Sequence, residues 1–303
     1  MLLPRHLVLV SPKNFGFNEQ TAASNKFQSV IKIDKLQERV LTEWNNVGKA
    51  LSDNEIAYTA FEPPKNKIVP DALFPNNWFA TLPTGDLIIF PMMAQNRRDE
   101  INEEIISWIA DKFIVKNLID LRSYASRGIF LEGTGSIVID HKLRTIYGCI
   151  SPRTDEQLLI ELGDLKNYIS YPFAASDRND NPIYHTNVMM SIGQNVAVVC
   201  LEAIKHAPTR ELIKERISQF GRPVIDISFA QMEAFCANIL EVKNTNGESI
   251  WLMSERAATN FTPLQMSELS RHSRIVTVNI DTIERVGGGG FRCLLAGIHL
   301  QKK

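Results

Sequence analysis

Several features that mark other protein classes are missing from the 303-residue sequence. No apolar run approaches the roughly 18 residues that a membrane-spanning helix needs. No long basic or acidic run is present either, and the formal net charge is -1, so nothing favours nucleic acid or an anionic membrane as a partner. The apolar segment Leu7 to Val10 is too short for a signal-peptide core. We therefore expect a cytoplasmic protein with a small-molecule ligand, and the sequence leaves a homo-oligomer open.

Cysteine is also scarce. The four cysteines lie far apart, and three of them, Cys149, Cys200 and Cys236, stand inside apolar, strand-like runs where a reduced and buried thiol is usual. Closely spaced ligand pairs of the C-x-x-C or H-x-x-x-H type are absent, so the sequence predicts neither a metal site nor a cofactor.

A strand-turn-strand pattern occurs four times along the chain, and each copy is followed by a helical pattern. The expected hairpins are 78–82 with 87–90, 136–140 with 145–150, 188–192 with 196–201, and 239–242 with 249–253. The helices expected after them are 98–112, 155–162, 209–220 and 254–270. The four turns recur at an interval of about 55 residues, which is typical of a modular fold.

The ends of the chain supply the pieces of a fifth module. Strands are expected at 7–10, 56–61 and 274–280, a helix at 33–50, and a last segment at 291–300. Joining these pieces would close a ring, and no segment has the composition of a linker. We therefore predict one α/β domain over residues 1–303, a propeller of five ββαβ modules with pseudo-fivefold symmetry around a central site.

The glycine-rich segment near the C-terminus ends in the fourth cysteine. Four glycines, Gly287 to Gly290, precede Phe291, Arg292 and Cys293. Glycine allows positive φ angles and leaves few side chains to cover the thiol, so this loop suits a nucleophilic cysteine.

Polar residues precede the other hairpins at corresponding positions, which all point toward the axis of such a ring. Asn76 and Asn77 precede the first hairpin, Glu132 the second, and His185 with Asn187 the third. A thiol, an imidazole and a carboxylate would thus meet in one pocket. The fourth module has Ala237 and Asn238 at this position, which we interpret as structural.

The segments 131–133, 185–187 and 287–293 resemble the three motifs of the guanidino-group-modifying superfamily. That group includes arginine deiminases, agmatine deiminases, dimethylarginine hydrolases and amidinotransferases, built on a five-module α/β propeller. The resemblance implies that Cys293 is the nucleophile, that His185 is the general acid and base, and that Glu132 holds the substrate nitrogens.

Two departures from the deiminase pattern bear on the substrate. Asn77 and Asn187 stand where deiminases usually carry aspartates that pair with the guanidinium cation. An amide both donates and accepts hydrogen bonds, which suits a neutral ureido group. The segment 74–79 also resembles the citrulline-hydrolysing branch, and Asp71 remains as a further carboxylate. We therefore predict hydrolysis of citrulline to ornithine, carbon dioxide and ammonia through an S-carbamoyl cysteine.

Alternatives remain open at this point. A deiminase or amidinotransferase acting on arginine, agmatine or dimethylarginine would keep the nucleophile and change the substrate. A mixed zinc site of Glu132, His185 and Cys293, or a non-catalytic propeller that binds a macromolecule, would use the same fold differently. A cation is also expected for the substrate carboxylate, and the candidates are Arg127, Arg285 and Arg292.

Overall fold

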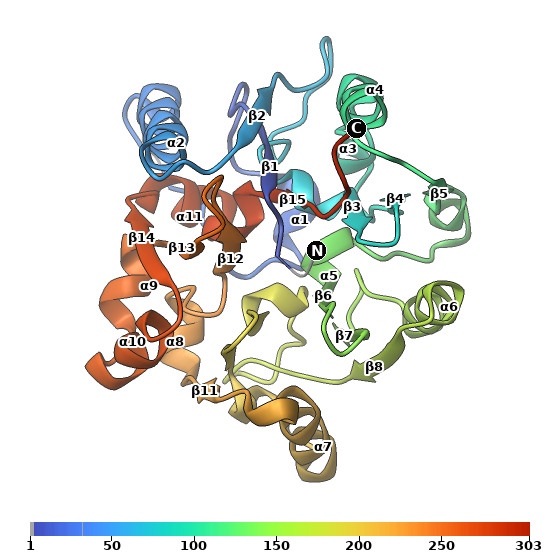
Figure 1. Ribbon diagram of the computed structural model, residues 1–303. Coiled ribbons are helices and arrows are strands. Elements are labelled where there is room, and N and C mark those ends of the chain that lie inside the picture. The colour runs from blue at the N-terminus through green and yellow to red at the C-terminus, as the bar shows by residue number, and fades with distance from the viewer. Residues whose placement is uncertain (1–2, 32) are drawn as a thin grey trace.

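The computed structural model describes residues 3–31 and 33–303, in which five three-stranded sheets surround a central axis (Figure 1). In every sheet the middle strand pairs with one antiparallel and one parallel neighbour. The parallel strand comes after a helix, because a parallel connection needs a crossover. The predicted ring of five α/β modules is therefore confirmed.

Four of the sheets are formed by consecutive strands. They are β3 (Phe79–Leu82), β4 (Asp86–Ile89) and β5 (Asn117–Asp120); β6 (Ile137–Asp140), β7 (Thr145–Cys149) and β8 (Ile169–Phe173); β9 (Met190–Ile192), β10 (Ala197–Val199) and β11 (Val224–Asp226); β12 (Leu240–Lys243), β13 (Ser249–Ser254) and β14 (Arg274–Val278).

The fifth sheet joins the two ends of the chain. Strand β1 (His6–Val10) pairs antiparallel with β15 (Ala296–Ile298), with Leu7 opposite Gly297, and parallel with β2 (Tyr58–Phe61). The split module predicted from the sequence is present, and this pairing closes the ring.

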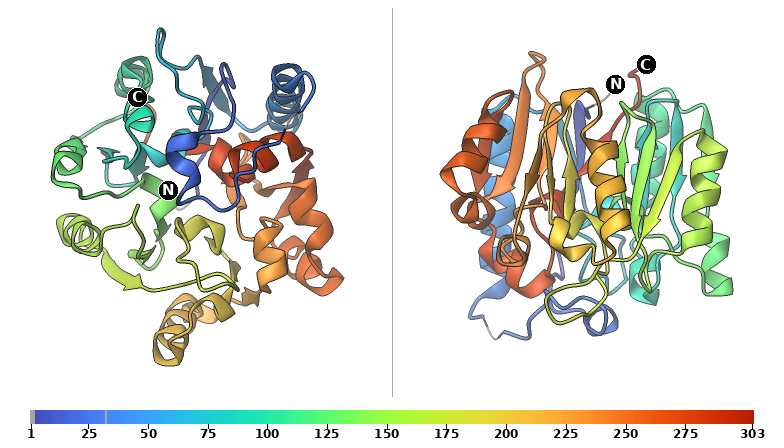
Figure 2. Two further views of the ribbon diagram at one scale, coloured as in Figure 1. Left: turned by 180° about the vertical axis from the view of Figure 1, so that it is seen from behind. Right: turned by 90° about the horizontal axis from the view of Figure 1, so that it is seen from below.

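The longer helices cover the outer side of the ring, as both views in Figure 2 show. They are α2 (Leu36–Asp53), α4 (Glu103–Lys112), α6 (Glu156–Lys166), α7 (Ala207–Ile217) and α10 (Pro263–Ser270). The shorter helices are α1 (Glu19–Ala22), α3 (Gln95–Arg98), α5 (Gly133–Ser136), α8 (Phe229–Glu233), α9 (Glu255–Asn260) and α11 (Asp281–Gly287).

Three helix predictions were wrong in detail. The helix expected at 254–270 is two helices, because Thr262 caps a new start and Pro263 has no N–H with which to continue the first. The helix expected at 98–112 is likewise divided, since Asn102 caps α4. Helix α11, directly before the glycine loop, was not predicted, and it ends where Gly288 adopts a φ of 63°.

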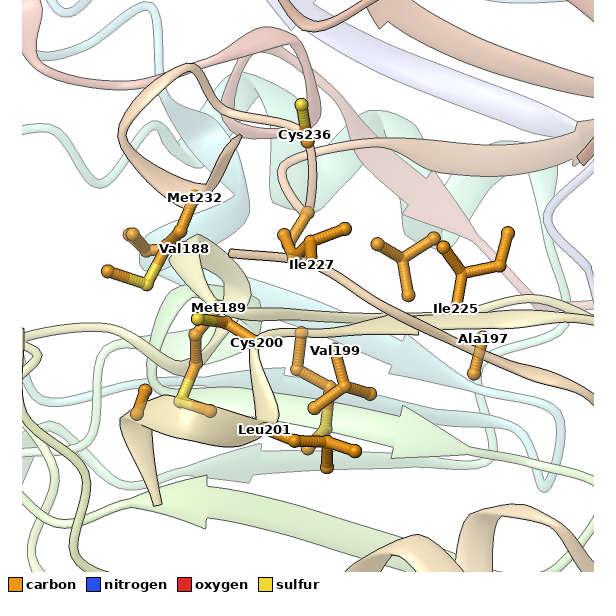
Figure 3. Packing of buried hydrophobic residues seen from close by; sticks show 14 of the residues in the cluster. Val188, Met189, Ala197, Val199, Cys200, Leu201, Ile225, Ile227, Met232 and Cys236 are labelled. Atoms are coloured by element: carbon orange, nitrogen blue, oxygen red, sulfur yellow. The ribbon is translucent and has the colours of Figure 1, made fainter. Parts of the chain in front are cut away.

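The core lies between neighbouring sheets and beneath the outer helices. Its largest cluster surrounds β9 and β10 and includes Met189, Val199, Cys200, Met232 and Cys236 (Figure 3). A fully buried side chain of this size contributes about 1.5–3 kcal/mol relative to an exposed one. Apolar packing on all sides thus fixes the third and fourth sheets relative to each other.

Over residues 3–31 and 33–303, no helix combines the length and the apolar character required to cross a membrane.

Candidate active site

Short turns that precede the hairpins meet at one end of the ring. They are η1 (Pro75–Asn77), α5, η3 (Thr186–Val188) and η6 (Phe291–Leu294). The turn η1 contacts both α5 and η6, and α5 also contacts η3. The polar positions that recur in the sequence therefore come together in space.

Gly135 of α5 allows two of these turns to approach closely. A methyl group in place of its hydrogen would lie 2.3 Å from Asn77 Nδ2 and 2.7 Å from His185 Nδ1. Neither neighbour can move away without disturbing its own buried turn. The glycine is required because the amide and the imidazole flank the backbone at this point.

Glu132 and His185 form a buried pair. His185 Nε2 lies 2.8 Å from Glu132 Oε2, and Arg153 Nη1 lies 3.4 Å from the same oxygen. Burial alone would raise the pKa of Glu132, but the charge of Arg153 and the His185 hydrogen bond lower it well below the usual range. An ionised Glu132 must accept the hydrogen bond, so Nε2 of His185 carries the proton and Nδ1 keeps its lone pair.

The second oxygen of Glu132 is also occupied. The backbone N–H of Met93 donates to Oε1 over 3.0 Å, and Glu132 does not line the cavity described below. Both oxygens of Glu132 therefore have hydrogen-bond partners, and its role toward a substrate stays a prediction from the family resemblance. Burial lowers the pKa of His185 to about 4, so its imidazole is neutral near pH 7.

Cys293 faces two carboxamides. Its Sγ lies 3.6 Å from Asn187 Nδ2, 3.4 Å from Asn238 Nδ2 and 3.5 Å from Asn238 Oδ1. Burial raises the pKa of the thiol, while Asn238 and Arg292 each lower it. Asn238, which we interpret from the sequence as structural, thus brings its side chain from the fourth module to the sulfur.

The glycine loop before Cys293 is held from the other side. Tyr184 Oη donates to the carbonyl oxygen of Gly288 over 2.9 Å, and Gln28 Nε2 donates to that of Gly287 over 3.1 Å. Asn25 Nδ2 lies 3.3 Å from the Gly288 oxygen as well. Residues far apart in sequence therefore fix the loop, and the N-terminal segment near α1 covers it.

Asp71 and Arg97 lie across the cavity from Cys293. Arg97 makes two hydrogen bonds of 2.8 and 2.9 Å to Glu100 and one of 2.7 Å to Asn77 Oδ1. Asp71 Oδ2 accepts from Asn18 at 2.7 Å, but its Oδ1 makes no hydrogen bond within the described part of the chain. Burial raises the pKa of Asp71. This carboxylate is thus only partly satisfied.

These groups enclose a cavity of about 20 Å³, which has room for roughly one water molecule. Its lining includes Asn25, Asp71, Phe74, Asn77, Arg97, Arg153, Tyr184, His185, Gly287, Gly288, Gly289 and Cys293. The cavity is too small for an amino acid.

The other residues predicted for the site lie elsewhere. Arg127 ends η2 (Arg122–Arg127) and packs over the Tyr124 ring, while Arg285 pairs with Asp281 at 2.8 Å on an exposed face of α11. Arg292 donates to the Leu295 carbonyl oxygen over 2.7 Å and lines a different cavity.

Asn76 bonds Thr134 Oγ1 at 3.4 Å and does not line the Cys293 cavity, since its neighbour Asn77 occupies that position.

The two arginines that do line the cavity were missed. Arg97 lies on α3 and Arg153 lies in the turn after β7. Each follows the second strand of its hairpin, so the repeat in the sequence could have indicated both positions. The predicted arginines lie near the recognised motifs in the sequence, whereas these two enter the cavity from other parts of the modules.

The mixed zinc hypothesis can be compared with this geometry. Within the described ranges, His, Cys, Asp and Glu side chains do not gather in groups of three or more that could hold a metal ion. The neighbours of the Cys293 thiol are instead amide groups.

Comparisons with known proteins agree on the fold. One similar structure is the N-terminal domain of ArgZ, an arginine dihydrolase from the ornithine-ammonia cycle in cyanobacteria, solved as a Cys-to-Ser mutant bound to substrate. It shares 14% identity with this chain at a TM-score of 0.74. The match covers 96% of this chain and 97% of that chain. A mutant of DDAH from Pseudomonas aeruginosa, solved in complex with citrulline, shares 15% identity with this chain at a TM-score of 0.63. The match covers 98% of this chain and 100% of the DDAH chain.

Full-length ArgZ matches at a TM-score of 0.75 and 14% identity over 96% of this chain, which spans only 40% of the ArgZ chain. The comparison with curated proteins gives no match. A family model described as N,N dimethylarginine dimethylhydrolase, eukaryotic, matches residues 11–300. Because that match covers nearly the whole chain and the fold agrees, the chain belongs to this dimethylarginine dimethylhydrolase family of the guanidino-group-modifying superfamily.

Proposed function

We propose that the chain is a cysteine hydrolase that cleaves a C–N bond in the guanidino group of arginine or a methylated arginine. The observation that carries this proposal is the charge balance of the cavity. Arg97 pairs with Glu100 and Arg153 with Glu132, which leaves Asp71 without a cation of its own and with a free Oδ1. A buried carboxylate in this state is costly unless a cation joins it.

Arginine carries one positive charge more than citrulline, so it balances Asp71 whereas a net neutral substrate does not. A relative of the same fold, the N-terminal domain of ArgZ, is an arginine dihydrolase that was solved with its substrate bound. Arg97 and Arg153 are the cations that line the cavity and replace Arg127, Arg285 and Arg292 as candidates for the substrate carboxylate.

The catalytic steps follow from the neutral imidazole. As the Cys293 sulfur bonds to the guanidino carbon, its proton passes to Nδ1 of His185. The imidazolium then gives that proton to the departing nitrogen as the C–N bond breaks. Water attacks the thiouronium carbon, His185 takes the water proton, and the S–C bond breaks to return the thiol. With arginine the sum is arginine plus water to citrulline plus ammonia.

Substrate charge assists the first step. Burial raises the thiol pKa in the empty site, and a bound guanidinium next to the sulfur lowers it, since an adjacent cation favours the thiolate. Nucleophile activation is thereby coupled to substrate binding.

Citrulline hydrolysis remains the second candidate, and one observation favours it. Asn77 Nδ2 and Asn187 Oδ1 are buried and have no hydrogen-bond partner among residues 3–31 and 33–303. An amide donor and an amide acceptor match the C=O and NH₂ of a ureido group. Under this hypothesis Cys293 attacks the ureido carbon and ornithine departs. Water then hydrolyses the carbamoyl-enzyme to carbon dioxide and ammonia.

Product analysis tests both candidates. The purified chain is incubated separately with arginine, dimethylarginine, agmatine and citrulline, and citrulline, ornithine, methylamines and ammonia are quantified. Citrulline formed from arginine or dimethylarginine supports the main proposal. Ornithine formed from citrulline, with arginine untouched, supports the second candidate, and turnover of none of the four contradicts both.

A further inference from the structure

Asn238 occupies an unusual place next to the nucleophile. It comes from the loop before β12, in the fourth module, and it is 1% exposed. Both ends of its carboxamide lie within 3.5 Å of Cys293 Sγ. No other side chain presents both a donor and an acceptor to this sulfur among the hydrogen bonds of the described residues.

The orientation of the carboxamide is fixed by its other contacts. One hydrogen of Nδ2 donates to the Asn187 carbonyl oxygen over 3.0 Å, and the backbone carbonyl of Asn238 accepts from the Arg292 N–H over 3.1 Å. A methyl group on Gly290 would lie 2.8 Å from Oδ1, so the glycine loop packs directly against the amide. The second Nδ2 hydrogen is the one left for the sulfur.

This arrangement matches the thiol in both of its protonation states. A neutral thiol donates its S–H to Oδ1, whereas a thiolate accepts from Nδ2. The side chain satisfies either state without a rotamer change. By contrast, the buried Cys149 and Cys236 thiols donate to carbonyl oxygens, which accept from a thiol and repel a thiolate.

We propose that Asn238 is a positioning residue that holds the Cys293 sulfur and stabilises its thiolate during the reaction. Its role rests on the proposed function of Cys293 as the nucleophile, but its effect on the sulfur is independent of the substrate. Other charged and titratable groups lie near the same sulfur or line its cavity: Arg292 on its own turn, Tyr184 and His185 before η3, and Asp71, Arg97 and Arg153. A test must therefore change Asn238 while leaving all of these in place.

The experiment measures the alkylation rate of Cys293 with iodoacetamide between pH 6 and pH 10, followed by peptide mass spectrometry. In Asn238→Asp the N–H donor is lost and a negative charge is added beside the sulfur. We expect the rate at each pH below the thiol pKa to fall about tenfold or more, the effect of losing one hydrogen bond to a charged atom. Asn238→Ser, which keeps a small polar side chain, should shift the rate in the same direction and covers the case in which the aspartate variant does not fold.

Asn179→Asp is the matched control, because it makes the same chemical change at an exposed asparagine. A rate profile in folded Asn238→Ser that coincides with the wild type would overturn the proposal and leave Asn238 as a packing residue.

On a substrate that the chain turns over, kcat should fall with the alkylation rate while KM changes less than about threefold, and a change confined to KM would also contradict the proposal. A shifted alkylation profile in a protein that turns over no guanidino or ureido compound would uphold the role of Asn238 and contradict the proposed function.

Discussion

The surroundings of Cys293 and Cys236 differ although both thiols are fully buried. Cys236 belongs to the largest apolar cluster, which Figure 3 shows in part, and its thiol donates to the Ala257 carbonyl oxygen over 3.4 Å. Burial raises its pKa to about 12. Cys293 also has a raised pKa, but amide N–H groups of Asn187 and Asn238 face its sulfur. The polarity of the neighbours, and not burial, separates the two thiols.

Reactivity therefore depends on whether the neighbouring groups donate hydrogen bonds to the sulfur. Carbonyl oxygens stabilise the thiol, while N–H groups and nearby cations stabilise the thiolate. The following substitutions test this difference.

The largest effect is expected for Cys293→Ser. A serine hydroxyl is a far weaker nucleophile near neutral pH, so kcat should fall by at least about 10³-fold while the protein stays folded. The measurement is turnover of the accepted substrate, with circular dichroism to check the fold. Activity within tenfold of the wild type would show that Cys293 is not the nucleophile.

His185→Ala should be next. One imidazole serves both half-reactions, so its loss is expected to lower kcat by about 10²–10⁴-fold, the usual range for a general acid or base. Intact mass spectrometry should also detect a covalent adduct on Cys293 that persists longer than in the wild type. His206→Ala, at an exposed histidine outside the cavity, is the control. Loss of activity in both variants would indicate a general defect instead of a catalytic role.

Much of the fold and several residues of the Cys293 site could be predicted from the sequence. The residues that were missed have physical reasons. The period of the repeat fixed which turns face the axis, so Asn77, His185 and Cys293 were placed together correctly. Asn238 was interpreted as structural, and only its distance to the Cys293 sulfur shows that the fourth module reaches the site. Arg97 was missed because the predicted arginines were those near the recognised motifs, whereas Arg97 reaches Asn77 from α3.

A smaller effect, on substrate preference, is expected from Asn77→Asp combined with Asn187→Asp. Carboxylates at both positions would compensate a guanidinium and remove N–H donors from a ureido oxygen. The ratio of kcat/KM for arginine to that for citrulline should rise, by roughly tenfold or more. The hydrogen bond from Arg97 to residue 77 should persist, because an aspartate oxygen at that position can still accept from the guanidinium. An unchanged ratio would show that these two asparagines do not set the preference between arginine and citrulline, and Asp71 would be the next residue to test.

The smallest effect is expected from Cys236→Ser, the counterpart of the first substitution. A serine hydroxyl can still donate to the Ala257 carbonyl oxygen and so replace the hydrogen bond of 3.4 Å that the thiol makes. The shorter C–O bond and the more polar hydroxyl fit less well among Met232 and its apolar neighbours, which should cost about 1–2 kcal/mol of unfolding free energy. Activity should stay within about threefold of the wild type, since the side chain lies outside the Cys293 cavity. Urea denaturation and kcat measured on the same preparation separate the two effects. A loss of activity without a loss of stability would show that Cys236 takes part in the reaction, and the contrast between the two thiols would no longer hold.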